Sequence, residues 1–345
     1  MLERIKPRTS LVKEILNRLP KRVWKSSTTT FLDPSVGSGQ FVVEIEKRLR
    51  AHGHTDKNIS KRVAGHERSQ FLVNLATHMN KLVGQYTVKS YEEYLEMSPE
   101  TKFDVIVGNP PFERSDTDAK RWTLWSEFVK KAFELADRVA MITPQSITGP
   151  GQFAMIKDKT TVIAVGEHVK KHFPDVGSSF AYFVAHNKRN PGNAKLITDS
   201  GEFDYDLKNA DFLPMVTTEE TLEQMNWLKQ RNSRVWTRGE LHTSNKSLFD
   251  DNGKYEVFHT NAQMLKTNVK NNNLSKIRVC VTLSGHPKFQ VIRNAYCSQA
   301  TMWTEFDTVK EAKKFANECN DEYIQKIMKN FKWSGWNSKE VIESL

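Results

Sequence analysis

Residues 31–41 of this 345-residue chain are Phe31-Leu32-Asp33-Pro34-Ser35-Val36-Gly37-Ser38-Gly39-Gln40-Phe41. The stretch passes from an apolar run through two closely spaced glycines into a helical pattern, which is typical of the turn between a strand and a helix. Glycine has no Cβ atom, so a ligand can lie directly on the backbone of such a turn. A dinucleotide fingerprint needs a third glycine where this chain has Val42. Asp33 would repel a pyrophosphate and attract a cationic group, such as the ammonium of an amino acid.

The same alternation of short apolar runs and helical patterns continues through the first two hundred residues. Strands are predicted at Thr30–Leu32, Arg62–Gly65, Tyr86–Val88, Phe103–Val107, Arg138–Ile142, Val162–Val165 and Phe180–Ala185. Helices are predicted at about 10–19, 40–52, 69–82 and 122–136. Continuous apolar strands that alternate with helices predict an α/β fold with a doubly wound, mostly parallel sheet. Ligands bind such sheets at the carboxyl ends of the strands, so chemistry is expected in the residues that follow each strand.

The alternation ends near residue 200, and a second, smaller α+β domain is predicted from there. We therefore predict two domains, residues 1–200 and 201–345. In the second domain the patterns predict a helix at about 219–230, long loops over 239–275, strands at Ile277–Leu283 and Phe289–Arg293, and a closing helix over Thr308–Lys329.

The composition is that of a globular protein, with 38% hydrophobic and 27% charged residues. No apolar run approaches the roughly 20 residues of a membrane span, so no membrane partner is expected. The three cysteines, Cys280, Cys297 and Cys319, form no CxxC pair. We therefore expect no disulfide framework and no metal site, and a reducing cytoplasm as the location.

The net charge of +10 is distributed unevenly along the chain. Residues 1–199 hold 31 basic and 22 acidic side chains, and residues 200–345 hold 20 and 19. Within the second part, residues 200–230 hold 2 basic and 7 acidic side chains, whereas residues 231–300 hold 11 and 4. The basic stretch 231–300 is either a solvated face or a surface for nucleic acid, since lysine and arginine gain by releasing phosphate counterions.

Two further motifs follow predicted strands. Glu67 ends the second strand, next to the glycine turn, where an acid can accept hydrogen bonds from ribose hydroxyls. The fourth strand runs into Asn109-Pro110-Pro111-Phe112. Two prolines stiffen this turn, so the Asn109 side chain and the Pro110 carbonyl can both point into one cleft, with the Phe112 ring beside them.

Together, Asp33–Phe41 and Asn109–Phe112 resemble the cofactor and catalytic motifs of the S-adenosylmethionine-dependent DNA amino-methyltransferases. The Asn-Pro-Pro-aromatic form is typical of the adenine-N6 branch. The order of cofactor motif, catalytic motif and separate domain is similar to the γ arrangement, which also occurs in type II restriction–modification enzymes. The resemblance covers about residues 5–200 and extends to Trp122–Ala136, Ala140–Ser146 and Phe173–Phe180.

The resemblance implies a class I methyltransferase fold, S-adenosylmethionine as cofactor and double-stranded DNA as partner. It implies cofactor contacts from Asp33, Pro34, Gly37, Gly39, Phe41, Glu67 and Asn109. Catalysis would depend on Asn109 and Pro110, whose oxygens accept the N–H bonds of an adenine flipped out of the duplex and stacked on Phe112. Phe173 or Phe180 would form the other wall of the base site, and core packing is the alternative for both.

The chain departs from the family pattern in two places. Lys6-Pro7-Arg8-Thr9 stands where the family often has Thr-Pro ahead of the first helix. The third predicted strand is followed by Lys89-Ser90-Tyr91-Glu92 where the family usually has an aspartate near the cofactor's adenine. Ser90 or Glu92 is the expected substitute for that acid.

Three other functions stay open at this point. The same catalytic turn occurs in methyltransferases that modify adenine in RNA or glutamine in proteins, and a non-catalytic DNA-binding protein could keep the fold. We expect the C-terminal domain to recognise the DNA target. No nuclease motif is found, so a restriction endonuclease would be a separate polypeptide, or there is none.

Overall fold

The computed structural model describes residues 6–112, 124–187, 193–231, 233–270, 272–332 and 335–345. The chain divides into two compact units, Met1–Leu213 and Pro214–Leu345. The division falls after the predicted position 200, because the first sheet continues through β8 (Ala194–Thr198) and β9 (Gly201–Tyr205). Among the described residues no helix is both long and apolar enough to cross a membrane.

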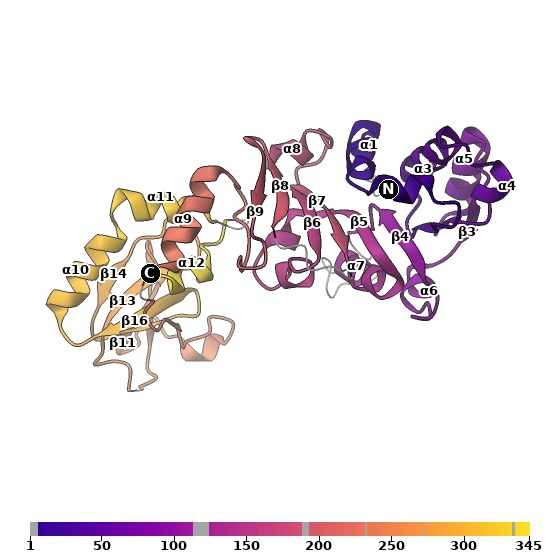
Figure 1. Ribbon diagram of the computed structural model, residues 1–345. Coiled ribbons are helices and arrows are strands. Elements are labelled where there is room, and N and C mark those ends of the chain that lie inside the picture. The colour runs from indigo at the N-terminus through magenta and orange to yellow at the C-terminus, as the bar shows by residue number, and fades with distance from the viewer. Residues whose placement is uncertain (1–5, 113–123, 188–192, 232, 271, 333–334) are drawn as a thin grey trace. The chain divides into compact units, whose positions relative to one another are not determined.

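The first unit is built on a nine-stranded sheet with the order β3-β2-β1-β4-β5-β7-β6-β8-β9. Its first seven strands are β1 (Phe31–Asp33), β2 (Val63–Glu67), β3 (Gln85–Val88), β4 (Phe103–Gly108), β5 (Ala136–Pro144), β6 (Thr160–Ala164) and β7 (Phe180–His186). The strands β1 to β5 are mutually parallel, and β7 runs antiparallel between β5 and β6 (Figure 1). This topology confirms the predicted α/β fold of the class I methyltransferase type, and every strand predicted in residues 1–200 is present.

Helices alternate with these strands along the chain. They are α1 (Thr9–Asn17), α2 (Lys21–Lys25), α3 (Gln40–Ala51), α4 (Asp56–Ile59), α5 (Gln70–Asn80), α6 (Tyr91–Leu95), α7 (Leu124–Leu135) and α8 (Glu167–Lys170). Each longer helix buries one apolar face. In α1 the buried residues are Leu11, Val12, Ile15 and Leu16, the spacing of one helical stripe. The predicted helix 122–136 corresponds to α7, and positions 122 and 123 lie outside the described residues.

The second unit contains two small sheets, of order β10-β16-β13-β14 and β12-β11-β15. The strands are β10 (Thr237–Arg238), β11 (Tyr255–Thr260), β12 (Gln263–Thr267), β13 (Ile277–Thr282), β14 (Gln290–Ile292), β15 (Ala295–Cys297) and β16 (Thr301–Phe306). The helices are α9 (Glu219–Lys229), α10 (Val309–Cys319), α11 (Glu322–Asn330) and α12 (Lys339–Glu343). This is the predicted smaller α+β unit.

Two predictions for the second unit were wrong in detail. The predicted long loops over 239–275 contain the β11–β12 hairpin, in which Val257 and Phe258 are buried while the edge strand β12 exposes most of its polar residues. The polar edge strand hides the alternation that would have revealed it. The predicted helix Thr308–Lys329 is two helices, because the Asp321 side chain accepts a hydrogen bond from the Tyr323 N–H and caps a new helix.

A buried glutamate ties α3 to the start of β3. The Glu46 side chain is fully buried and accepts hydrogen bonds from the backbone N–H groups of Val83 and Gly84. It also accepts the Tyr86 hydroxyl proton at 2.7 Å and pairs with Arg50 at 2.9 Å. Burial of a carboxylate is tolerated only when its lone pairs are satisfied in this way. The network fixes the edge of the sheet beside the glycine turn.

We expect Glu46→Ala to destabilise the first unit by about 3 kcal/mol, because three partly buried donors lose their acceptor. Chemical denaturation followed by fluorescence measures the change. The matched control is Arg50→Ala, which removes only the more exposed partner and should cost under about 1 kcal/mol. Equal losses in the two variants would contradict this account of the network.

Candidate functional site

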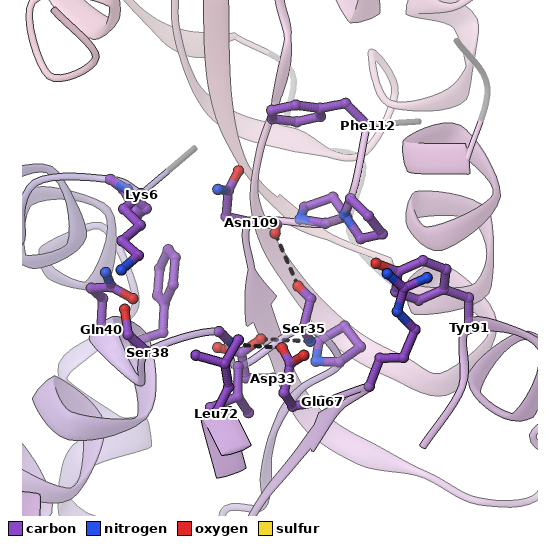
Figure 2. Close-up of a pocket in the computed structure, with 18 of the residues that line it drawn as sticks. Lys6, Asp33, Ser35, Ser38, Gln40, Glu67, Leu72, Tyr91, Asn109 and Phe112 are labelled. Carbon is purple, nitrogen blue, oxygen red and sulfur yellow. Dashed lines mark hydrogen bonds between the residues drawn. The ribbon is translucent and has the colours of Figure 1, made fainter. Parts of the chain in front are cut away.

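A cavity of about 470 Å³ opens at the carboxyl ends of β1, β2 and β4. A volume of this size suits a small-molecule ligand. Figure 2 shows Asp33, Ser35 and Glu67 between the labelled Lys6 and Tyr91. The lining residues that sequence reasoning predicted are Asp33, Pro34, Gly37, Phe41, Glu67, Asn109, Pro110 and Phe112. The structure thus brings the predicted cofactor and catalytic motifs together around one cavity.

Asp33 is a buried carboxylate at the base of this cavity. Its exposed fraction is 2%, and its Oδ1 accepts a hydrogen bond from the Ser35 N–H at 2.9 Å. The pKa of Asp33 is raised to about 7, chiefly by burial and also by the charge of Glu67, while the Ser35 hydrogen bond acts in the opposite direction. A cationic ligand would offset the cost of this buried charge.

Glu67 ends β2 and is held by the backbone on both sides. Its Oε2 accepts the Gly37 N–H and its Oε1 accepts the Ser69 N–H, each at 3.0 Å. These bonds fix the position of the carboxylate in the cavity wall. The arrangement suits a ligand with two neighbouring hydroxyl groups, as a ribose has.

The two glycines of the turn have different roles. Gly37 and Gly39 both have positive φ angles, +58° and +94°, which residues with a Cβ atom rarely adopt. Gly37 lines the cavity, whereas Gly39 does not. Gly39 precedes α3, and a Cβ atom there would lie 3.3 Å from the Ala76 Cβ. Gly39 therefore shapes the turn and permits the packing of α5 against it.

The Asn-Pro-Pro turn is tied to the glycine turn by a hydrogen bond that sequence reasoning missed. The Ser35 hydroxyl donates to the Asn109 carbonyl oxygen at 3.0 Å (Figure 2). Gly108, just before the turn, has no room for a side chain, because a Cβ atom would lie 2.9 Å from the Asp33 Oδ1. The Asn109 Oδ1 is shielded from solvent. The two turns therefore hold each other in register.

Three aromatic rings lie beyond the turn. The ring centroids of Phe112 and Phe180 are 5.4 Å apart, and those of Phe180 and Phe173 are 4.5 Å apart. Phe112 and Phe180 line the cavity. Phe173 is 2% exposed, belongs to the hydrophobic core and does not line the cavity. The structure therefore places Phe180 beside Phe112, with Phe173 packed on Phe180 from the core.

Neither expected substitute for the aspartate after β3 lines the cavity. The Ser90 hydroxyl accepts the Glu93 N–H and caps α6, and Glu92 is not among the lining residues. Lys89 and Tyr91 line the cavity instead. The further lining residues that sequence reasoning did not select are Lys6, Pro7, Ser35, Val36, Ser38, Gln40, Arg68, Leu72, Pro111, Pro144 and Ser178. Many of these residues directly follow a predicted strand or adjoin one of the motifs, and this position was the sequence signal that could have identified them.

The central part of the first unit matches a known protein family. Residues 37–167 match the model of the family described as Eco57I restriction-modification methylase. The matched segment includes Gly37, Glu67 and the Asn109–Phe112 turn. The match confirms the predicted resemblance to restriction–modification methyltransferases and agrees with S-adenosylmethionine as the cofactor. No curated protein sequence matches the chain.

The solved structures that resemble this chain are distant from it in sequence. A DrdV–DNA complex has a TM-score of 0.50 and 12% identity, over 93% of this chain and 52% of that chain. The type IIG restriction endonuclease BpuSI has a TM-score of 0.46 and 12% identity, over 98% and 57%. A modification subunit of a putative type I restriction enzyme from Vibrio vulnificus has a TM-score of 0.45 and 14% identity, over 78% and 60%. The chain spans between 52% and 60% of the length of these structures.

The raised pKa of Asp33 predicts a pH-dependent cost to folding. Between pH 3.8 and about 7 the folded protein keeps a proton on Asp33 that the unfolded chain releases, so this residue removes stability as the pH rises through that window. We expect Asp33→Asn to raise the unfolding midpoint of the ligand-free protein at pH 8 more than at pH 5. Thermal unfolding at both pH values measures the difference. The exposed Asp158, changed to Asn, is the control, and an effect of Asp33→Asn that is independent of pH would contradict the prediction.

Proposed function

We propose that the protein is a sequence-specific DNA adenine-N6 methyltransferase that uses S-adenosylmethionine. One observation carries the proposal: the Asn109 turn and the Asp33–Glu67 pair face the same cavity and are joined by the Ser35–Asn109 hydrogen bond. The methylase family match over residues 37–167 supports it.

The residues of the cavity fit the chemical groups of this cofactor. Among the described residues no cationic side chain forms an ion pair with the buried Asp33 carboxylate, and the amino-acid ammonium of the cofactor would supply a positive charge there. Glu67 would accept the ribose hydroxyls. Gly37 leaves the backbone of the turn open to close approach. When bound, the cofactor supplies a methyl group activated on a sulfonium sulfur.

Asn109 and Pro110 would act on the acceptor amino group. The adenine amino nitrogen is a weak nucleophile because its lone pair is delocalised into the ring. The Asn109 Oδ1 and the Pro110 carbonyl oxygen accept its two N–H bonds, favour a tetrahedral nitrogen and stabilise the positive charge that grows on it. In the transfer the nitrogen would gain the methyl group, the electron pair of the broken carbon–sulfur bond would stay on sulfur, and one N–H proton would leave afterwards. No general base is needed before the transfer.

An adenine inside a duplex cannot reach this turn, so the target base must flip out. Phe112 would stack on the flipped base, which is worth about 1–3 kcal/mol. Of the two residues that the sequence offered for the second wall, Phe180 lines the cavity, with its ring centroid 5.4 Å from that of Phe112, whereas Phe173 does not line it. Phe180 is therefore the better candidate for a second aromatic contact. Ser178, also on the cavity wall, would lie beside them.

The second unit would recognise the DNA target. Of the 11 basic residues in 231–300, Arg278 is buried and pairs with Glu240 at 3.7 Å. Eight others are exposed to solvent, and they are Arg234, Arg238, Lys246, Lys254, Lys266, Lys270, Lys288 and Arg293. Exposed cations of this kind favour binding to phosphates. The sequence also has three consecutive asparagines at 271–273, of which Asn271 lies outside the described residues.

Transfer of labelled methyl from S-adenosylmethionine to duplex DNA of mixed sequence tests the proposal directly. Nucleoside analysis should find the label as N6-methyladenine. RNA and protein run as parallel acceptors, since label in either one alone would overturn the DNA assignment. Cofactor binding with no transfer to any acceptor would support the non-catalytic alternative.

We expect Asn109→Ala to reduce methyl transfer by about 100-fold or more, because the growing charge on the amino nitrogen loses an acceptor. The Kd for S-adenosylhomocysteine should stay within about twofold of the wild type, since Asp33 and Glu67 remain in place. Single-turnover kinetics and calorimetry measure the two quantities. Asn74→Ala, on the exposed side of α5, is the matched control, and substantial turnover by Asn109→Ala would refute the mechanism.

A further inference from the structure

The second unit buries two free cysteine thiols side by side between its two sheets. Cys280 lies on β13 in one sheet and Cys297 lies on β15 in the other, and the exposed fraction of each is 0%. Their Sγ atoms are 3.0 Å apart. The pair shares a small hydrophobic cluster with Phe258 and Trp303, which shields it from water. The two cysteines are 17 positions apart, a spacing that gives no sequence signal for this contact.

A second contact between the same two strands fixes the backbone around the pair. Arg278 precedes Cys280 by two residues, so the two side chains leave β13 on the same face. The buried Arg278 guanidinium donates a hydrogen bond to the carbonyl oxygen of Ala295, which lies two residues before Cys297 on β15. The two neighbouring contacts therefore hold β13 and β15 in one relative position, with the sulfur atoms facing each other.

This geometry lies close to that of a covalent link. An S–S bond is about 2.05 Å long, so the two sulfur atoms need to approach by only about 1 Å to form one. Small rotations about the Cα–Cβ bonds of both residues supply that distance. The third cysteine, Cys319, is also fully buried but lies on α10 outside this cluster, so it offers an internal control.

We propose that Cys280 and Cys297 form a reversible disulfide that links the two sheets of the second unit. The oxidant is a hydroperoxide such as hydrogen peroxide. One thiolate attacks an oxygen of the peroxide, the O–O bond breaks, and a sulfenic acid and water result. The second thiol attacks the sulfenic sulfur, the S–S bond forms and another water leaves. Two thiols thus lose two electrons and two protons, and one peroxide is reduced to two molecules of water.

Burial makes this reaction slow in the folded protein. It raises the pKa of the Cys280 thiol, with Cys297 acting in the same direction and Arg278 in the opposite one, so little reactive thiolate is present near neutral pH. Peroxide must also reach sulfur atoms that solvent does not touch, which requires local opening of the second unit. We therefore expect oxidation to be faster at higher pH and in urea below the unfolding transition.

Peptide mapping after treatment with hydrogen peroxide tests the proposal, both in buffer and in urea below the unfolding transition. The remaining thiols are blocked with N-ethylmaleimide, and the protein is digested with trypsin. We expect a linked pair of peptides, residues 279–288 and 294–310, which dithiothreitol separates. Cys319 should be recovered in its alkylated form. Three free thiols after both treatments, or a link that includes Cys319, would overturn the proposal.

Thermal unfolding gives a second, independent measurement. The midpoint for the second unit should be about 5–10 °C higher in the oxidised protein than in the reduced one, because the link closes a loop in the unfolded chain. Cys280→Ala and Cys297→Ala should each abolish this difference. Cys319→Ala is the matched control, since it removes another buried thiol and should keep the difference. Each variant is compared with itself in two redox states, so its lost packing energy cancels.

The same midpoint for oxidised and reduced wild-type protein would contradict a link between the sheets. So would a difference that persists in Cys280→Ala. All three cysteines belong to the second unit, and none lines the cavity of the first unit. The outcome therefore decides the disulfide proposal separately from the methyltransferase proposal.

Discussion

The buried carboxylate of Asp33 is the constraint on which the rest of the site depends. A charge placed this far from water is costly, and its raised pKa records that cost. The neighbourhood is arranged to keep the carboxylate open on one side: the Ser35 N–H binds Oδ1, and Gly108 supplies the only residue type that leaves room beside it. Stability is thus given up where a ligand cation can restore it, a trade that is common in binding sites.

Parallel strands explain how residues far apart in the sequence reach this carboxylate. Asp33, Glu67 and Gly108 end three adjacent strands, β1, β2 and β4, whose carboxyl ends meet at one edge of the sheet. Hydrogen bonds then set the spacing of the turns that follow. The Glu67 carboxylate holds the glycine turn, and the Ser35 hydroxyl holds the Asn109 turn. A shift in one strand would therefore displace the proposed cofactor contacts and the proposed catalytic contacts together.

Local sequence patterns were enough to predict the first sheet and much of the cavity wall, because apolar runs and the motifs at strand ends each consist of consecutive residues. They failed where structure depends on partners distant in the chain. The Ser35–Asn109 hydrogen bond joins residues 74 positions apart, and no pattern around either residue announces it. Phe173 and Phe180 share a motif and are both buried in the core, yet only the structure shows that Phe180 also lines the cavity. The β11–β12 hairpin is held by the pairing of β11 with β15, a partner that local sequence does not reveal. Its polar edge strand β12 was therefore predicted as a loop.

The division of the chain after Leu213 has an evolutionary consequence. The cavity residues and the exposed cations of 231–300 belong to separate compact units, each with its own hydrophobic core. Substitutions that remodel one unit need no compensating repacking inside the other. Under the proposed function, new target sequences could arise by drift or exchange of the C-terminal unit alone. The methyl-transfer reaction of the first unit would stay the same, while the DNA sequence recognised by the second unit could change.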